Sequence, residues 1–110
     1  MGGPWDPSDI SRARSVPLLK VLSYVSDYVK EDPNYTPRTP SAGSRRFQVN
    51  CHKRDFRLIL TGEKWLDELA DRGAKRRGGG GGVDLVMHLT GMNFVQAVKT
   101  CLDADLLEGQ

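Results

Sequence analysis

In this 110-residue chain, the residues that most clearly suggest a chemical role are basic side chains concentrated in its middle third. Residues 38–77 include eleven lysines and arginines and five acidic residues, although the whole chain carries a formal net charge of only +2. Arginine outnumbers lysine in the chain, and its guanidinium group matches the geometry of phosphate oxygens. A local excess of positive charge steers anions, and lysine and arginine supply most of the affinity for a nucleic-acid backbone.

We therefore expect this region to form a nucleic-acid-binding surface. Phe47 and Phe56 fall on the apolar faces of expected strands and are predicted core residues. Trp65 remains as a candidate for stacking on a base, with burial in the core as the alternative. The candidate nucleic-acid-binding residues are Arg45, Arg46, Lys53, Arg54, Arg57, Trp65, Arg76 and Arg77.

The sequence gives little support for catalysis, nucleotide binding or metal binding, and we do not expect an enzyme. His52 and His88 have no serine or cysteine at a spacing typical of nucleophilic catalysis, and no paired-carboxylate motif is present. The glycine run 78–82 lacks the Lys-Ser/Thr that completes a phosphate-binding loop, although it leads into a helix start. Cys51 and Cys101 are interpreted as two reduced thiols. No cofactor and no metal ion are expected.

Length and composition exclude several classes of protein. A chain of 110 residues is one domain of ordinary size, and it can bury a core without a metal or disulfide. No run approaches the ~20 apolar residues of a membrane span, and no secretory signal is recognised. We expect a cytoplasmic protein with a flexible tail at 1–15 and a single domain at 16–107.

An apolar stripe predicts one N-terminal helix over residues 16–31. Its members recur at intervals of three and four, as on one face of a helix. Pro33 disfavours helical geometry in the residue before it and so ends the helix. The proline-rich segment 32–44 is predicted to be a loop. The stripe consists of Leu18, Leu19, Leu22, Val25 and Val29.

Alternating apolar and polar residues predict two strands, at 46–51 and 56–61, joined by a charged turn at 52–55. Lys64–Leu66 would add a third strand after a turn at 61–63. The same segment, EKWLDELADRG, also fits a short helix that ends at a glycine. Periodicity alone favours the helix slightly, with the strand as the alternative.

The C-terminal part predicts two further helices. Apolar spacing resumes at 83–89, and Asn93 is a suitable N-cap for a last helix that starts at Phe94. The five glycines at 78–82 are predicted to lie outside any helix or strand interior, since each costs ~1 kcal/mol there relative to alanine. The expected fold class is α+β: a small antiparallel sheet of about three strands with an N-terminal helix and two C-terminal helices.

The stretch from Gly81 to Val98 resembles the end of the zinc-finger module at the start of bacterial and plasmid DNA primases. The resemblance also covers a leading helix, the two strands and a Lys-Trp-x-Asp segment at 64–67, for which it favours a strand. It extends over roughly residues 16–102. The matching positions are Gly81-Gly82, Val83-Asp84-Leu85-Val86-Met87, Gly91, Phe94 and Ala97-Val98.

The resemblance implies a relative that lacks zinc. The family binds zinc through C-x2-H or C-x2-C pairs, whereas here Cys51 and His52 are adjacent and no cysteine lies near residues 76–79. The polymerising acidic centre of a primase is also absent, so catalysis is not carried over. The implied role is binding of nucleic acid, most of all single-stranded DNA, as an accessory or template-binding module in replication of a plasmid or other mobile element. The alternative is a protein-binding module or inhibitor that acts on a host or replication protein.

Overall fold

The chain folds as an α+β domain around one open antiparallel sheet. The computed structural model describes residues 5–37, 43–70 and 77–106. The five strands lie in the sheet in sequence order, β1-β2-β3-β4-β5, each antiparallel to the next. The elements are α1 (Pro7–Arg14), α2 (Leu18–Val25), β1 (Tyr28–Glu31), β2 (Arg45–Cys51), β3 (Arg54–Thr61), β4 (Lys64–Asp67), β5 (Gly78–Gly80), α3 (Gly82–Thr90) and α4 (Phe94–Asp105).

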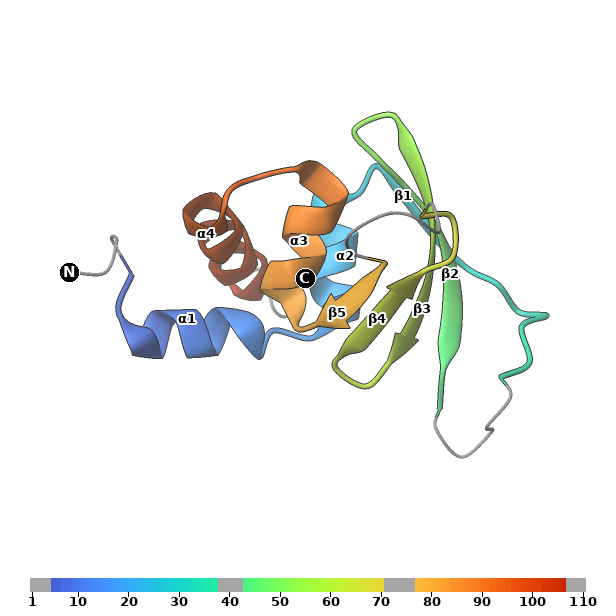
Figure 1. Ribbon diagram of the computed structural model, residues 1–110, viewed down its shortest axis with the longest axis horizontal. Helices are drawn as coiled ribbons and strands as arrows, with labels where there is room; N and C mark the ends of the chain where they lie inside the picture. Colours follow the sequence, from blue (N-terminus) through green and yellow to red (C-terminus); the bar gives the residue numbers. More distant parts are fainter. Residues whose placement is uncertain (1–4, 38–42, 71–76, 107–110) are drawn as a thin grey trace.

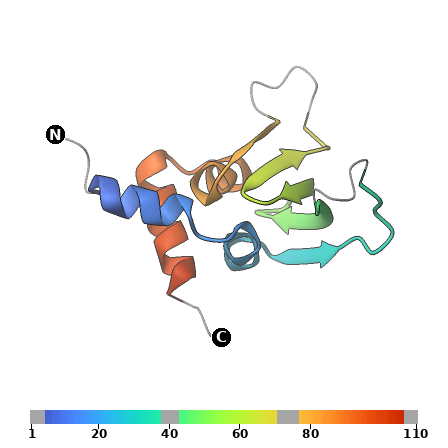
Figure 2. The same ribbon diagram turned by 90° about the horizontal axis from the view of Figure 1, so that it is seen from below.

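All four helices lie on one side of the sheet (Figures 1 and 2). Helices α2 and α3 cover its inner face, and α1 and α4 pack against them from the far side. One apolar cluster joins α2 and α3 to strands β2, β3 and β4, and a second cluster joins the four helices to one another. No helix among the described residues covers the outer face of the sheet.

Strict alternation on β2 and β3 explains this one-sided packing. Phe47 and Val49 on β2, and Phe56 and Leu58 on β3, point inward and are almost fully buried. Burial of each such side chain stabilises the fold by roughly 1.5–3 kcal/mol. The residues between them are polar or charged and face outward, as in a sheet that is solvated on one side. The expected α+β class and the two central strands are therefore confirmed.

The N-terminal predictions were wrong in two places. Residues 7–14, expected as part of a flexible tail, form α1, which Asp6 caps and Pro7 opens. Trp5 anchors this helix through a hydrogen bond from its Nε1–H to the Val95 carbonyl, at 3.0 Å. The first four residues of the expected tail lie outside the described residues.

The predicted helix 16–31 is instead helix α2 followed by strand β1. The helix ends at Val25, and β1 then pairs with β2, Val29 opposite Val49. Val25 and Val29 both pack against the core from these different elements. An interval of four residues fits a helix face, but it is also a multiple of the strand period of two. The apolar spacing could therefore not show where the helix stops.

The region after β3 confirms one prediction and overturns another. Residues 64–67 form β4, so the strand favoured by the resemblance is confirmed and the alternative helix is wrong. The glycine run, expected outside regular structure, supplies the edge strand β5 and the first residue of α3. A Cβ on Gly78 would lie 2.7 Å from the Trp65 carbonyl oxygen, and one on Gly82 would lie 3.0 Å from Val21. Glycine allows close approach to the backbone of β4 at Gly78 and to the side chain of Val21 at Gly82, which offsets its low propensity.

Candidate nucleic-acid interface

The predicted basic residues do not share one surface. Arg46 and Arg57 have outward positions on β2 and β3, whereas Arg45 and Arg54 have the inward parity at opposite ends of the sheet. The register places Arg45 opposite Leu60 and Arg54 opposite Cys51. Six strand positions, roughly 20 Å, therefore separate these two arginines along the sheet. Arg76 lies outside the described residues, and Arg77 is exposed directly before β5.

Two of the predicted arginines are neutralised by neighbouring carboxylates. Arg45 donates two hydrogen bonds to Glu31, at 2.7 and 2.8 Å, and these bonds lower the pKa of Glu31. Arg46 donates from Nη2 and Nε to Asp32, at 2.6 and 3.0 Å, and likewise lowers the pKa of that carboxyl. A second carboxylate, Glu68, lies 3.4 Å from Arg46. These arginines already have anionic partners, so a phosphate would have to displace them.

Arg46 also lies over an aromatic ring. Its guanidinium carbon lies 4.9 Å from the ring centre of Tyr35, and its side chain is 27% exposed. A planar guanidinium fixed in this way by a ring and two carboxylates has little freedom to follow a ligand. Arg46 therefore organises the loop after β1 and keeps that loop against the sheet.

Trp65 is a core residue, which corrects the expectation that it stacks on a base. It is 3% exposed and faces inward from β4. Its ring lies 4.8 Å from the ring of His88 on α3, and Phe56 lies 5.6 Å from the same histidine. The inward parity follows from pairing with β3, where Trp65 stands opposite the inward-facing Leu60. A side chain buried in this way cannot reach a nucleic-acid base.

The outer face of the sheet carries cations that the sequence analysis missed. Lys30 on β1 and Lys64 on β4 are exposed, face outward and form no ion pair within the described residues. Lys30 stands beside Gln48, which in turn stands beside Arg57, so the three form one row across β1, β2 and β3. The helix expected over 16–31 concealed Lys30. Alternation of Tyr28, Val29 and Lys30 was the available signal for a strand there.

Arg57 lies at the centre of this face, on β3 between β2 and β4. Its Nε is buried and makes no hydrogen bond within the described part of the chain. Asp32 is near enough that the charge of Arg57 helps to lower the pKa of that carboxyl, but only Arg46 bonds to it. A buried donor without a partner is costly, and a phosphate could reach only the terminal nitrogens of this half-buried side chain, not the buried Nε.

The β2–β3 turn presents two more cations, Lys53 and Arg54, that form no ion pair within the described residues. His52 and Lys53 both have positive φ angles, 52° and 66°, in a two-residue turn that favours Asn-Gly. Lys53 is exposed at this turn, and the adjacent Arg54 lies over the ring of Phe56 at 5.0 Å. Lysine in this left-handed conformation is strained, because its Cβ crowds the backbone. Lys53 thus occupies a turn position whose backbone conformation suits glycine better.

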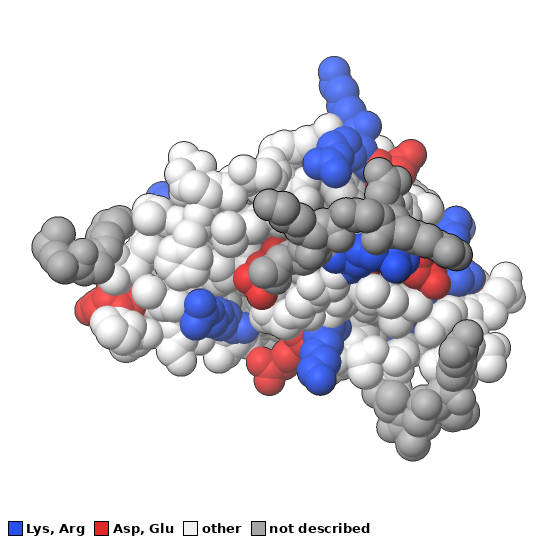
Figure 3. All heavy atoms as spheres, viewed as in Figure 1, with Lys and Arg blue, Asp and Glu red and all other residues white. Residues whose placement is uncertain are grey.

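Charges of both signs are visible on the surface. In the view of Figure 3 lysine and arginine side chains stand in separate groups with acidic side chains between them. The described residues form no continuous basic patch on the face seen there. Phosphate contacts would therefore have to come from individual cations of the sheet that form no ion pair within the described residues, and not from a continuous basic patch.

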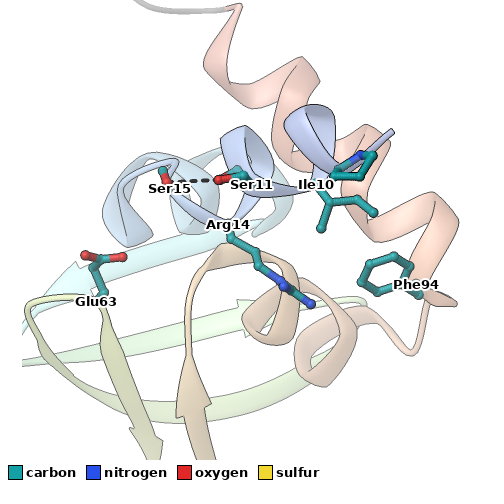
Figure 4. A pocket seen from close by; sticks show the side chains of 7 residues that line it. Ile10, Ser11, Arg14, Ser15, Glu63 and Phe94 are labelled. Atoms are coloured by element: carbon teal, nitrogen blue, oxygen red, sulfur yellow. Dashed lines mark hydrogen bonds between the residues drawn. The ribbon is translucent and has the colours of Figure 1, made fainter. Parts of the chain in front are cut away.

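A shallow pocket of about 420 Å³ lies away from this outer face, between α1, α4 and the β3–β4 turn (Figure 4). Arg14 extends into it beside Phe94, with its guanidinium carbon 5.9 Å from the ring centre, and Glu63 lies across from it. One cation and one carboxylate could hold a small zwitterion. None of its lining residues is a histidine or cysteine. The pocket is lined by Pro7, Ile10, Ser11, Arg14, Ser15, Glu63 and Phe94.

The remaining candidates for chemistry are buried. Burial raises the pKa of Cys101 to about 12 and also raises the pKa of Cys51, so both thiols stay protonated. Gly81 and Gly82, at the start of α3, are buried against Arg14 and Val21. Within the described residues no three histidine, cysteine or acidic side chains gather as metal ligands, and no helix is long and apolar enough to cross a membrane.

Comparison of this chain with models of protein families, with the curated proteins and with the solved structures finds no match, so its function has to be inferred from the arrangement of its own side chains.

Proposed function

We propose that this protein binds nucleic acid, and single-stranded DNA in particular, through the outer face of its sheet and the adjoining β2–β3 turn. The observation that carries the proposal is the distribution of unpaired cations. On the helical side, Arg12, Lys20 and Lys99 each form an ion pair, and Arg14 forms none within the described residues but lies over the ring of Phe94. On the sheet side, six cations form none within the described residues. These are Lys30, Lys53, Arg54, Arg57, Lys64 and Arg77.

Unpaired cations are the ones that gain most from a phosphate. A paired cation must lose its carboxylate before it contacts a phosphate, whereas an unpaired cation only releases water. Lys30 and Arg57 lie on one row, about 10 Å apart across β2, and Lys64 stands further along the same face. A strand of nucleic acid laid across the sheet would meet these three in turn.

The resemblance to the primase zinc-finger module gives this surface a biological setting. A domain of this type without zinc would hold a template strand, or assist a replication protein, in plasmid or mobile-element replication. Inward-facing apolar side chains of β2, β3, α2 and α3 then do what zinc does in the family, because they hold the sheet together. The part of the outer face that neither a described helix nor the loop after β1 covers is left for the template.

Fluorescence anisotropy with a labelled single-stranded oligonucleotide tests the proposal. We expect the logarithm of the binding constant to fall with the logarithm of the salt concentration, with a slope of about −0.7 per phosphate contacted, hence about −2.8 for contacts from Lys30, Lys53, Arg57 and Lys64. The double variant Lys30→Ala/Arg57→Ala should reduce the slope by about 1.4 and weaken binding. The matched control Arg12→Ala/Lys99→Ala removes the same charge from the helical side and should leave both unchanged. Binding that ignores salt, or equal losses in both double variants, would refute the assignment.

A protein partner is the second candidate, favoured by apolar side chains on the same outer face. Leu66 on β4 is 41% exposed, and Ile59 lies next to it on β3. A partner held by these residues would be lost in Leu66→Asp and kept after nuclease treatment. The nucleic-acid proposal instead predicts that nuclease treatment removes the bound molecule, because that molecule is the nucleic acid itself.

A further inference from the structure

We infer that Tyr28 is the base-stacking residue of this surface, and that it gives the domain its preference for single strands over duplex. The inference rests on the proposed nucleic-acid function. It goes beyond that proposal because it names the residue that recognises bases and gives the physical reason for a preference for single strands.

Tyr28 is the exposed aromatic residue of the sheet. Its side chain is 53% exposed, against 3% for both Trp65 and Phe47. It faces outward because the next residue, Val29, packs against the core. It begins an edge strand, so one side of the ring has no neighbouring strand to cover it.

The surroundings of the ring suit a base and a phosphate together. Tyr28 stands opposite Asn50, whose amide donates to Asp55 at 2.9 Å, so these neighbours bond to each other. Lys30 lies two residues further along the same face, roughly 6.7 Å away. A nucleotide whose base lies on the tyrosine ring therefore has an unpaired ammonium group within reach of its backbone.

Stacking on this ring distinguishes single strands from duplex. An unpaired base offers a free π face, and stacking on an aromatic side chain is tolerant of sequence because every base has such a face. In a duplex both faces of each base are already stacked, so the same ring would have nothing to contact unless the helix opens. Phosphate contacts from Lys30 and Arg57 do not make this distinction, because both forms carry phosphates.

The test compares an oligothymidylate with an abasic strand of the same length, which keeps the phosphates and lacks the bases. We expect the wild-type protein to bind the oligothymidylate at least about fivefold more tightly than the abasic strand. Tyr28→Ala should bring this ratio close to one without changing the salt slope, and Tyr28→Phe should retain it. Tyr24→Ala removes a tyrosine of α2 that is 42% exposed, against 53% for Tyr28, and serves as the matched control. It should behave as wild type.

The outcomes separate the two proposals. If Tyr28→Ala keeps the wild-type ratio while Lys30→Ala/Arg57→Ala still lowers the salt slope, Tyr28 does not stack and the nucleic-acid function stands. If the wild-type protein binds neither strand, both proposals fail. Circular dichroism of each variant establishes that a change in the ratio does not come from unfolding, and Tyr28→Phe supplies a variant that keeps the ring.

Discussion

The Nε2 atom of His88 lies 2.8 Å from the carboxylate of Asp67, inside the interface between α3 and β4. Asp67 is 2% exposed, and its other oxygen accepts a hydrogen bond from the backbone N–H of Leu69 at 3.0 Å. An ionised carboxylate only accepts, so Nε2 of His88 is the donor. The pair therefore fixes a helix to a strand through a polar contact surrounded by apolar residues, with the rings of Trp65 and Phe56 against the imidazole.

Removal of the histidine should destabilise the fold strongly. In His88→Ala the buried carboxylate of Asp67 loses its side-chain donor, and breaking one partner of a buried pair costs about 3 kcal/mol. Urea unfolding followed by tryptophan fluorescence measures this loss. Lys99→Ala breaks the exposed pair with Asp103, and it should cost less than about 1 kcal/mol. Equal costs for the two variants would show that the His88–Asp67 contact is not specially important.

The same pair predicts how stability responds to acid. Burial alone would raise the pKa of Asp67, but the hydrogen bonds from His88 and Leu69 outweigh it and leave the pKa below its usual value of 3.8. Because the folded pKa is lowered, the contribution of this carboxylate is fully present above the unfolded pKa and is lost as pH falls through the folded value. Asp67→Asn should thus be less stable than wild type at pH 7, with the difference shrinking below about pH 4. Denaturant unfolding from pH 7 to pH 2.5 tests this, and a difference that stays constant over this range would contradict it.

Two glycines of the same run should respond oppositely to alanine. A Cβ at Gly78 would lie 2.7 Å from the Trp65 carbonyl oxygen, so β5 must move away from β4, at a cost of about 1–3 kcal/mol. A Cβ at Gly80 would have only the Glu63 carbonyl oxygen near it, at 3.8 Å. Gly80→Ala should be neutral or stabilise by up to about 1 kcal/mol, because it restricts the unfolded chain. Thermal unfolding of both variants decides this, and a similar Tm for both would mean that β5 does not contact β4 this closely.

The contrast between these glycines shows where sequence reasoning stops for the fold. Strands β2 and β3 were predictable because alternation alone fixes which residues face the core. Strand β5 has no side chains to alternate, and what makes it a strand is pairing with β4, a partner more than ten residues earlier. Helix α1 has few apolar residues and is fixed by its capping residues and by the hydrogen bond from Trp5 to Val95, a contact between distant parts of the chain.

The residue types of the candidate site could be predicted from the sequence, but the positions and partners of its side chains could not. The sequence shows an excess of arginine, but it cannot show that Arg45 and Arg46 have carboxylate partners from β1 and the loop after it. These partners come from residues 14 positions away, and only the β1–β2 pairing brings them together. Lys30 and Tyr28 were missed for the same reason, since a helix over 16–31 gives them no common face with Arg57.

Replacing the strained lysine at the β2–β3 turn should raise the stability of the fold and weaken the binding of nucleic acid. Lys53 has φ of 66°, a conformation that costs a residue with a Cβ roughly 1–2 kcal/mol and costs glycine little. Lys53→Gly should therefore raise the free energy of unfolding by about 1 kcal/mol. It should also weaken oligonucleotide binding and lower the salt slope by about 0.7, because one phosphate contact is lost.

Two further substitutions separate backbone strain from charge at this turn. Lys53→Asn tolerates the left-handed conformation and removes the charge, so it should resemble Lys53→Gly in both measurements. Lys53→Arg keeps both charge and strain and should match wild type in stability and in salt slope. If Lys53→Gly stabilises the fold without any loss of affinity, the turn lies outside the interface, and the strain at Lys53 has a cause other than phosphate binding. If it destabilises the fold, the positive φ is not a source of strain.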